Sequence, residues 1–138
     1  MAKVTFKLGD YADKLVKLRS EYEEVAKKAV YEGAAIVANE IRSNLENAVS
    51  DEATGELLDS LGISPIERDK VGNFNAKVGF DGYDSKGVPN QLKARVLESG
   101  SSKQNKRPFV RPAINSTKKR VEKAMSRVVD EAIRKIMD

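Results

Sequence analysis

The sequence contains no cysteine, no histidine and no tryptophan. Without cysteine the chain can form neither a disulfide nor a thiolate site. Without histidine it also lacks the Ser–His and Cys–His nucleophile systems and the usual zinc ligands. Only carboxylate metal sites and lysine or tyrosine chemistry are left. We therefore expect no enzymatic activity, no catalytic residue and no cofactor.

Long apolar runs are absent as well. No segment approaches the roughly 18 apolar residues that a membrane-spanning helix needs. The first residues, MAKVTFKLGDYADK, lack the apolar core of a signal peptide, which predicts that the protein is not secreted by that route. A chain of 138 residues that is 40% hydrophobic and 33% charged predicts one soluble domain spanning residues 1–138, without membrane association.

The charge is distributed unevenly along the chain. The net charge is +4, but residues 103–138 hold eleven Lys/Arg against four Asp/Glu, a net of +7 that leaves −3 for the rest. Such asymmetry is typical of proteins that bind nucleic acid or an acidic partner. It is equally typical of a helix with a solvated basic face, so composition leaves these interpretations open.

Helical periodicity marks both ends of the sequence. Apolar residues recur at spacings of three and four from about residue 10 to 48, which predicts a long helix, either continuous or broken near Gly33. A second apolar stripe predicts a C-terminal helix over about 112–137, and LKARVLESG predicts a short helix over 92–100 that Gly100 closes.

Strand patterns lie mainly between these helices. Residues 3–8 alternate, and in 71–80 one apolar face is formed by Phe74, Ala76, Val78 and Phe80. A hairpin with its turn near Glu67–Lys70 would pair the second strand with residues before it, where Pro65 restricts pairing to an edge. We expect a sheet region over about 57–80 and a polar linker at SDEATG, residues 50–55. The element order predicts an α+β fold with a long N-terminal helix, a small, mostly antiparallel sheet, a short helix and a long C-terminal helix.

Two groups of charged residues could carry a function. Asp81 and Asp84 share a loop and could bind a hard cation, but the loop lacks the ligands of a calcium site, so we expect no metal. The C-terminal helix carries basic residues that could contact phosphates. The residues concerned are Lys118, Lys119, Arg120, Lys123 and Arg127.

The segment KRPFVRPA places two Arg-Pro pairs around a phenylalanine. Proline disfavours the α conformation in the residue before it, so Arg107–Arg111 should be extended, and Pro112 suits the first turn of a helix. Phe109 could then enter the core, or the arginines could pair with acidic groups of a neighbouring subunit. The candidate interface residues are Arg107, Phe109 and Arg111.

Three motifs in order resemble the head–tail joining or tail-completion family of long-tailed bacteriophages, also described as minor tail components. TGELLDSL is similar to the family's T-G-x-L-x-x-S-I, LESGSS to V-E-[FY]-G-T-S, and RPFVRPA to R-P-F-[LM]-R-P-A. Ser99 and Leu61 depart from the family's pattern. The motif residues expected to be structural are Thr54, Gly55, Leu57, Ser60, Glu98, Gly100, Pro108 and Pro112.

The resemblance implies a structural virion protein of a tailed phage or prophage. Such a protein would dock between the head connector and the tail-tube proteins as a homo-oligomeric ring, for which six copies is one option, assembled from free monomers. It would be located in the virion neck or tail, and in the host cytoplasm during assembly, with only incidental DNA contact. The alternative is a small nucleic-acid-binding protein that uses the basic C-terminal helix.

Overall fold

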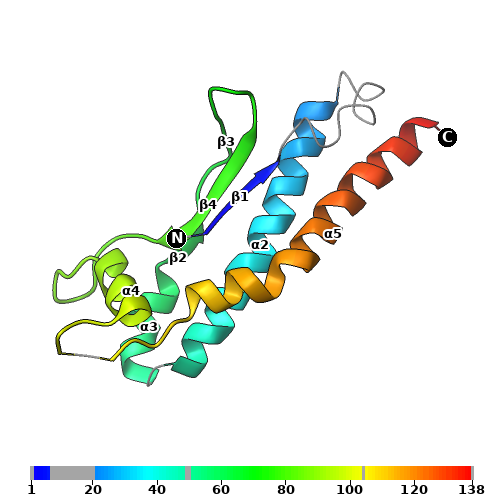
Figure 1. Cartoon of the computed structure of the whole chain (residues 1–138). Helices are drawn as coiled ribbons and strands as arrows, with labels where there is room; N and C mark the ends of the chain where they lie inside the picture. The colour runs from blue at the N-terminus through cyan, green and yellow to red at the C-terminus, as the bar shows by residue number, and fades with distance from the viewer. Residues whose placement is uncertain (1, 7–20, 49–50, 104, 138) are drawn as a thin grey trace.

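A computed structural model describes residues 2–6, 21–48, 51–103 and 105–137 (Figure 1). The sequence prediction of an α+β fold is confirmed: a long helix precedes a small antiparallel sheet, which is followed by a short helix and a long C-terminal helix. The elements in chain order are β1 (Ala2–Phe6), α2 (Tyr22–Ala48), α3 (Asp51–Asp59), β2 (Leu61–Ile63), β3 (Glu67–Arg68), β4 (Phe74–Phe80), α4 (Asn90–Ser99) and α5 (Val110–Met137).

Strand β4 is the centre of the sheet. β1 pairs antiparallel with one of its edges, while β2 and β3 pair antiparallel with the other. Pro65 lies between β2 and β3, at an edge where a missing backbone N–H removes no central ladder bond. Along β4 the alternate side chains are buried, which confirms the apolar face expected from the sequence; they are Phe74, Ala76, Val78 and Phe80.

The turn before β4 lies a few residues later than the sequence predicted. Glu67 and Arg68, expected in the turn, are paired with β4 as β3. The turn is closed by Asp69, whose Oδ1 accepts the N–H groups of Val71 and Asn73, both at 2.9 Å. The backbone N–H of Asn73, opposed by burial and assisted by Val71, lowers the pKa of Asp69. Because the Asp69 carboxylate accepts these two backbone N–H groups, the turn forms closer to β4 than the sequence predicted.

Helix α2 packs against the sheet and against α5, which crosses it (Figure 1). The core consists of the stripe on α2 that includes Ala29, Val37 and Ile41, together with the apolar side of α5. α2 continues without a break through Gly33, and the part of the long helix expected over 10–20 lies outside the described residues.

Gly33 explains why no break occurs. A Cβ at this position would lie 2.9 Å from Val4 Cγ1, 3.2 Å from Val121 Cγ1 and 3.3 Å from Met125 Sδ. The glycine therefore lies at a point where β1 and α5 both pack tightly against α2. Because glycine has no side chain, β1 and α5 can pack closely against α2 at this point, and α2 continues to Ala48.

The expected polar linker at residues 50–55 is wrong for the described part, because Asp51–Asp59 forms α3. The residues at the start of α3 favour a turn, but the burial of Leu57 near the end of α3 stabilises the helix. Leu57 is almost fully buried, and α3 packs against α2. Such tertiary burial commonly outweighs local propensity.

None of the described helices is both long enough and apolar enough to cross a membrane.

Candidate docking surface at the start of the last helix

The end of α4 and the segment before α5 lie side by side. Gly100 closes α4 with φ of 79°, a conformation that favours glycine, and donates its N–H to the carbonyl of Val96 at 2.7 Å. The chain then returns, and the N–H of Arg107 donates to the carbonyl of Leu97 at 2.7 Å. The segment 105–109, which we call the strap, is thereby held against the last turn of α4.

Glu98 accepts the hydrogen bonds that open α5. Its Oε1 accepts the N–H groups of Phe109 at 2.7 Å and Val110 at 2.8 Å, and its Oε2 accepts that of Arg111 at 2.9 Å. A helix leaves its first four N–H groups without internal partners. The fourth position here is Pro112, which has no N–H. One carboxylate and one proline therefore account for the whole helix start.

The electrostatics of Glu98 follow from this geometry. Partial burial opposes its ionisation, but the N–H groups of Val110, Arg111 and Phe109 outweigh burial and lower the pKa, with help from the Arg111 charge. The positive end of the α5 dipole favours the same charged form. Glu98 is therefore an ionised anchor between α4 and α5.

The helix start also corrects the prediction for the strap. Residues Arg107–Arg111 were expected to be extended, but α5 begins at Val110, two residues before the expected boundary. Proline at 112 disfavours helical Arg111. The three hydrogen bonds to Glu98 overcome this preference because they stabilise the helical arrangement of the N–H groups.

Phe109 points into the molecule. Its side chain is fully buried and packs edge-on against Phe80, with ring centroids 5.8 Å apart, and its carbonyl accepts a hydrogen bond from Asn44 Nδ2 at 3.2 Å. A direct contact between Phe109 and a partner would require the ring to leave the core. Arg107 and Arg111, by contrast, are exposed.

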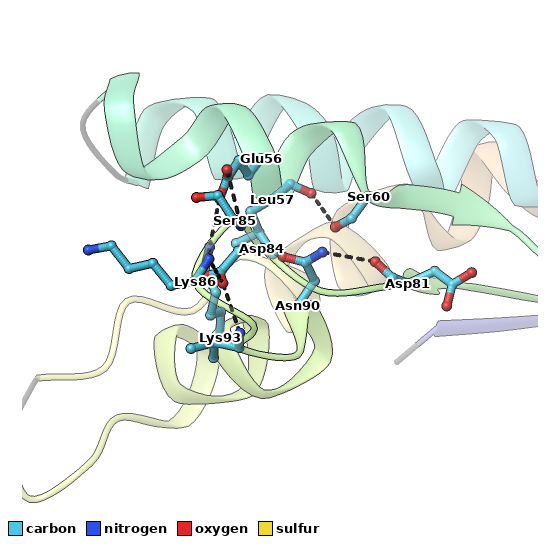
Figure 2. Close-up of polar contacts among 10 residues, drawn as sticks. Glu56, Leu57, Ser60, Asp81, Asp84, Ser85, Lys86, Asn90 and Lys93 are labelled. Atoms are coloured by element: carbon cyan, nitrogen blue, oxygen red, sulfur yellow. Dashed lines mark hydrogen bonds and ion pairs between the residues drawn. The ribbon is translucent and has the colours of Figure 1, made fainter.

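A second polar cluster joins α3 to the loop before α4 (Figure 2). Ser60 closes α3 by donating its hydroxyl to the Leu57 carbonyl at 2.7 Å, and its own carbonyl accepts the N–H of Asp81 at 3.0 Å. The buried Asn90 donates its Nδ2 to the Asp81 carbonyl at 2.9 Å. These bonds hold the end of α3, the end of β4 and the start of α4 together.

Asp84 organises the loop itself. Its Oδ1 accepts the N–H groups of Lys86 at 2.9 Å and Val88 at 2.8 Å, and its Oδ2 pairs with Lys93 of α4 at 3.2 Å (Figure 2). The Val88 N–H, opposed by burial and assisted by Lys93, lowers the pKa of Asp84. Glu56 of α3 accepts the N–H of Ser85 at 3.3 Å. The carboxylate of Asp84 is thus used to shape the loop.

No group of three potential metal-ligating side chains gathers anywhere in the described parts of the chain.

The motif residues named from the sequence gather at one end of the molecule. Leu57 and Ser60 lie at the end of α3, Glu98 and Gly100 at the end of α4, and Pro108 in the strap (Figure 1). Thr54 and Gly55 belong to α3, and Pro112 to the first turn of α5.

The sequence did not predict which groups these motif residues bind. Glu98 lies eleven to thirteen positions before its three donors, beyond any local capping pattern. The only signal available was a glutamate in one motif followed by a proline-bounded helix start in the next.

The basic side chains of α5 were another candidate surface. Arg120 pairs with Glu40 of α2 at 3.3 Å, while Lys118, Lys119 and Lys123 are exposed. Exposed Glu122 and Glu131 lie on the same helix. The outer side of α5 is therefore mixed in charge, with an excess of lysine towards its first half.

Comparison with known families places this architecture in a class. The family model HK97-gp10-like, described as "Bacteriophage HK97-gp10, putative tail-component", matches residues 7–100, more than half of the chain. The chain belongs to this family of bacteriophage tail components, which confirms the phage family expected from the motifs. The matched region contains the first motif in full and the second motif as far as Gly100, and it ends before the strap. Neither the curated proteins nor the solved structures compared with the chain gave a match.

Proposed function

We propose that this phage structural protein completes the tail at the neck, where it joins the head connector to the tail tube by protein–protein docking. The observation that carries this proposal is the strap. Glu98 and the buried Phe109 fix the strap and the first turn of α5, which present Arg107 and Arg111, respectively, at the molecular surface. A rigid support of this kind suits recognition, because little conformational freedom is lost on binding.

Arginine suits such a contact for a chemical reason. Its planar guanidinium can donate two parallel hydrogen bonds to one carboxylate, which fixes orientation as well as attraction. Acidic side chains of a neighbouring subunit or of a neck protein are therefore the expected partners of Arg107 and Arg111.

The expected assembly is a homo-oligomeric ring, built from monomers on the partner. A ring repeats one heterologous interface, in which two different sides of the molecule meet. The excess positive charge in residues 103–138 and the net negative charge of the rest suit such contacts. In this proposal the protein is made in the host cytoplasm, is incorporated at the virion neck, and contacts DNA only incidentally.

Replacing Arg111 tests the proposal. Arg111→Ala keeps the backbone N–H that binds Glu98, so we expect little change in thermal stability but fewer joined heads and tails, counted by electron microscopy. Arg42→Ala, at an exposed position of α2, is the matched control. Equal losses of stability and joining would show that Arg111 is only structural. A reconstruction of virions without this chain at the neck would overturn the proposal as a whole.

The exposed lysines of α5 favour a second candidate, non-specific nucleic-acid binding. Binding through phosphate contacts weakens steeply as salt rises. Because Glu122 and Glu131 interrupt the basic side, we expect any mobility shift of DNA to disappear at physiological salt. A shift that persists at that salt and is lost in Lys119→Glu/Lys123→Glu would support this function instead.

A further inference from the structure

A groove opens between α4 and the first turns of α5. It encloses about 790 Å³, and Phe80, Leu92, Val110 and Ile114 are among its lining residues. Leu92 and Ile114 are 41% and 39% exposed and both line the groove, so they present apolar surface there. The groove therefore offers apolar surface and the volume to enclose a large side chain.

The rim of the groove is positively charged. Arg95 and Arg111 both line it, and Arg95 forms no ion pair within the described residues. The one carboxylate in the lining, Glu98, already accepts three N–H groups from the start of α5. The ionised Glu98 offsets part of the charge of Arg111, so the two guanidinium groups and this one carboxylate together give the rim a net positive charge. An aromatic ring next to an acidic side chain fits both the apolar lining and the rim.

The same chain presents such a group in the loop beside the groove, where the backbone of Tyr83 pairs with that of Pro89, a lining residue. Tyr83 in the loop before α4 is 72% exposed, more than any other described aromatic residue, and does not line the groove of its own copy. Asp81, two residues before it, is exposed. The hydrogen bonds of Asp84 and Asn90 hold the loop in shape (Figure 2). Tyr83 belongs to this loop and therefore has a pre-organised support.

We propose that Tyr83 of one copy inserts into the groove between α4 and α5 of another copy. This inference rests on the proposed ring, for which it names the subunit contact. The ring of Tyr83 packs between Leu92 and Ile114, and Asp81 approaches the rim guanidinium of Arg95. A buried tyrosine removes about 150–250 Å² from water and is a common anchor of interfaces. Because Tyr83 and Asp81 are not among the residues that line the groove, each contact leaves one free loop and one free groove, so the contact can repeat.

Disulfide trapping tests the contact directly, because the natural chain has no cysteine. Tyr83→Cys copies are mixed with Ile114→Cys copies at high concentration and oxidised mildly. We expect a mixed covalent dimer, several-fold more abundant than either homodimer. Tyr31→Cys replaces Tyr83→Cys in the control mixture, since Tyr31 is also strongly exposed, at 57%. A Tyr83–Ile114 yield no higher than this control would overturn the inference.

A charge exchange tests the rim. Arg95→Glu and Asp81→Lys, each introduced into the cysteine-bearing copies, should lower the yield of the mixed disulfide about tenfold or more, whereas introducing both changes should recover much of the loss. Failure of the double variant to recover would contradict the pairing.

The two proposals also fail separately. A ring at the neck without the Tyr83–Ile114 bond would leave the proposed function standing and remove this contact. If the cysteines at positions 83 and 114 of two copies form the disulfide but the neck of the virion lacks the chain, the contact would stand and the proposed function would fall.

Discussion

The two ends of the molecule are held together by different forces. Where α2 crosses α5 and the sheet, the interior is almost entirely hydrocarbon, with small side chains such as Ala29 and Ala34 that allow close approach. Where α3, α4 and the strap meet, the elements are fixed mainly by carboxylate and amide hydrogen bonds, together with the anchor Phe109.

This difference in forces gives the apolar end and the hydrogen-bonded end different roles. Hydrophobic packing is non-directional and mainly stabilises, whereas charge-assisted hydrogen bonds fix orientation. The motifs that resemble the phage family lie at the polar end, where orientation decides which arginines face outward. The apolar end carries the long helices that support it.

The largest expected effect would remove the apolar anchor from the polar end. Phe109→Ala should lower the free energy of unfolding by about 3–5 kcal/mol, because a fully buried ring is replaced by a cavity beside Phe80. Urea denaturation measures the loss. Val71→Ala is the control, at a position that is 85% exposed, and should change stability little. A loss below about 1 kcal/mol would mean that the strap is not anchored by its ring.

The next effect addresses the hydrogen-bonded anchor. Glu98→Gln keeps the shape but replaces one accepting oxygen with an NH₂ group that faces N–H donors, so we expect a loss of about 1–3 kcal/mol. Amide hydrogen exchange should become faster at the start of α5 and stay unchanged at the centre of α2. Glu56→Gln, whose contacts to Ser85 are long and exposed, is the control. Uniform acceleration throughout the molecule would contradict a local anchor.

Two glycines in helices should respond to alanine with opposite signs. Gly33→Ala places a Cβ 2.9 Å from the stiff side chain of Val4 and should cost about 1–3 kcal/mol of stability. Gly55→Ala in α3 meets nothing within 4 Å and should stabilise by up to about 1 kcal/mol, because alanine favours helix. Thermal unfolding of both variants measures the difference. Equal signs would show that packing density does not distinguish the two ends.

The smallest expected effect is the pH dependence of the stability that Glu98 contributes. The pKa of Glu98 in the folded protein lies below its ordinary value of 4.5, so its ionised form stabilises the fold above that pH. This contribution is lost as the pH falls through the folded pKa. The stability difference between the natural protein and Glu98→Gln should therefore shrink below about pH 4.5, in urea titrations at several pH values. Asp69 and Asp84 are present in both proteins, so their contributions to the pH dependence of stability cancel in the difference. A pH-independent difference would show that shape, not charge, makes the anchor.

Much of the fold could be predicted from periodicity. The alternation that buries Phe74 and Phe80 and the stripe through Val37 and Ile41 depend only on which side of a strand or helix a residue occupies. The helix at residues 51–55 was missed because its support, the burial of Leu57 against α2, comes from a distant segment. Arg107 and Arg111 were identified as interface candidates, but the hydrogen bonds by which Glu98 holds this segment were not predicted.

The sequence by itself determined the element types, the apolar faces, the absence of cysteine and histidine chemistry and the resemblance to a phage family, because each follows from residue identity or from spacing along one element. Only the tertiary structure decided that α5 starts at Val110, that Phe109 faces inward, and that Leu92 and Ile114 line a groove with Arg95 at its rim. Those outcomes depend on partners brought together from distant parts of the chain, and pairings of that kind leave no periodic trace in a single sequence.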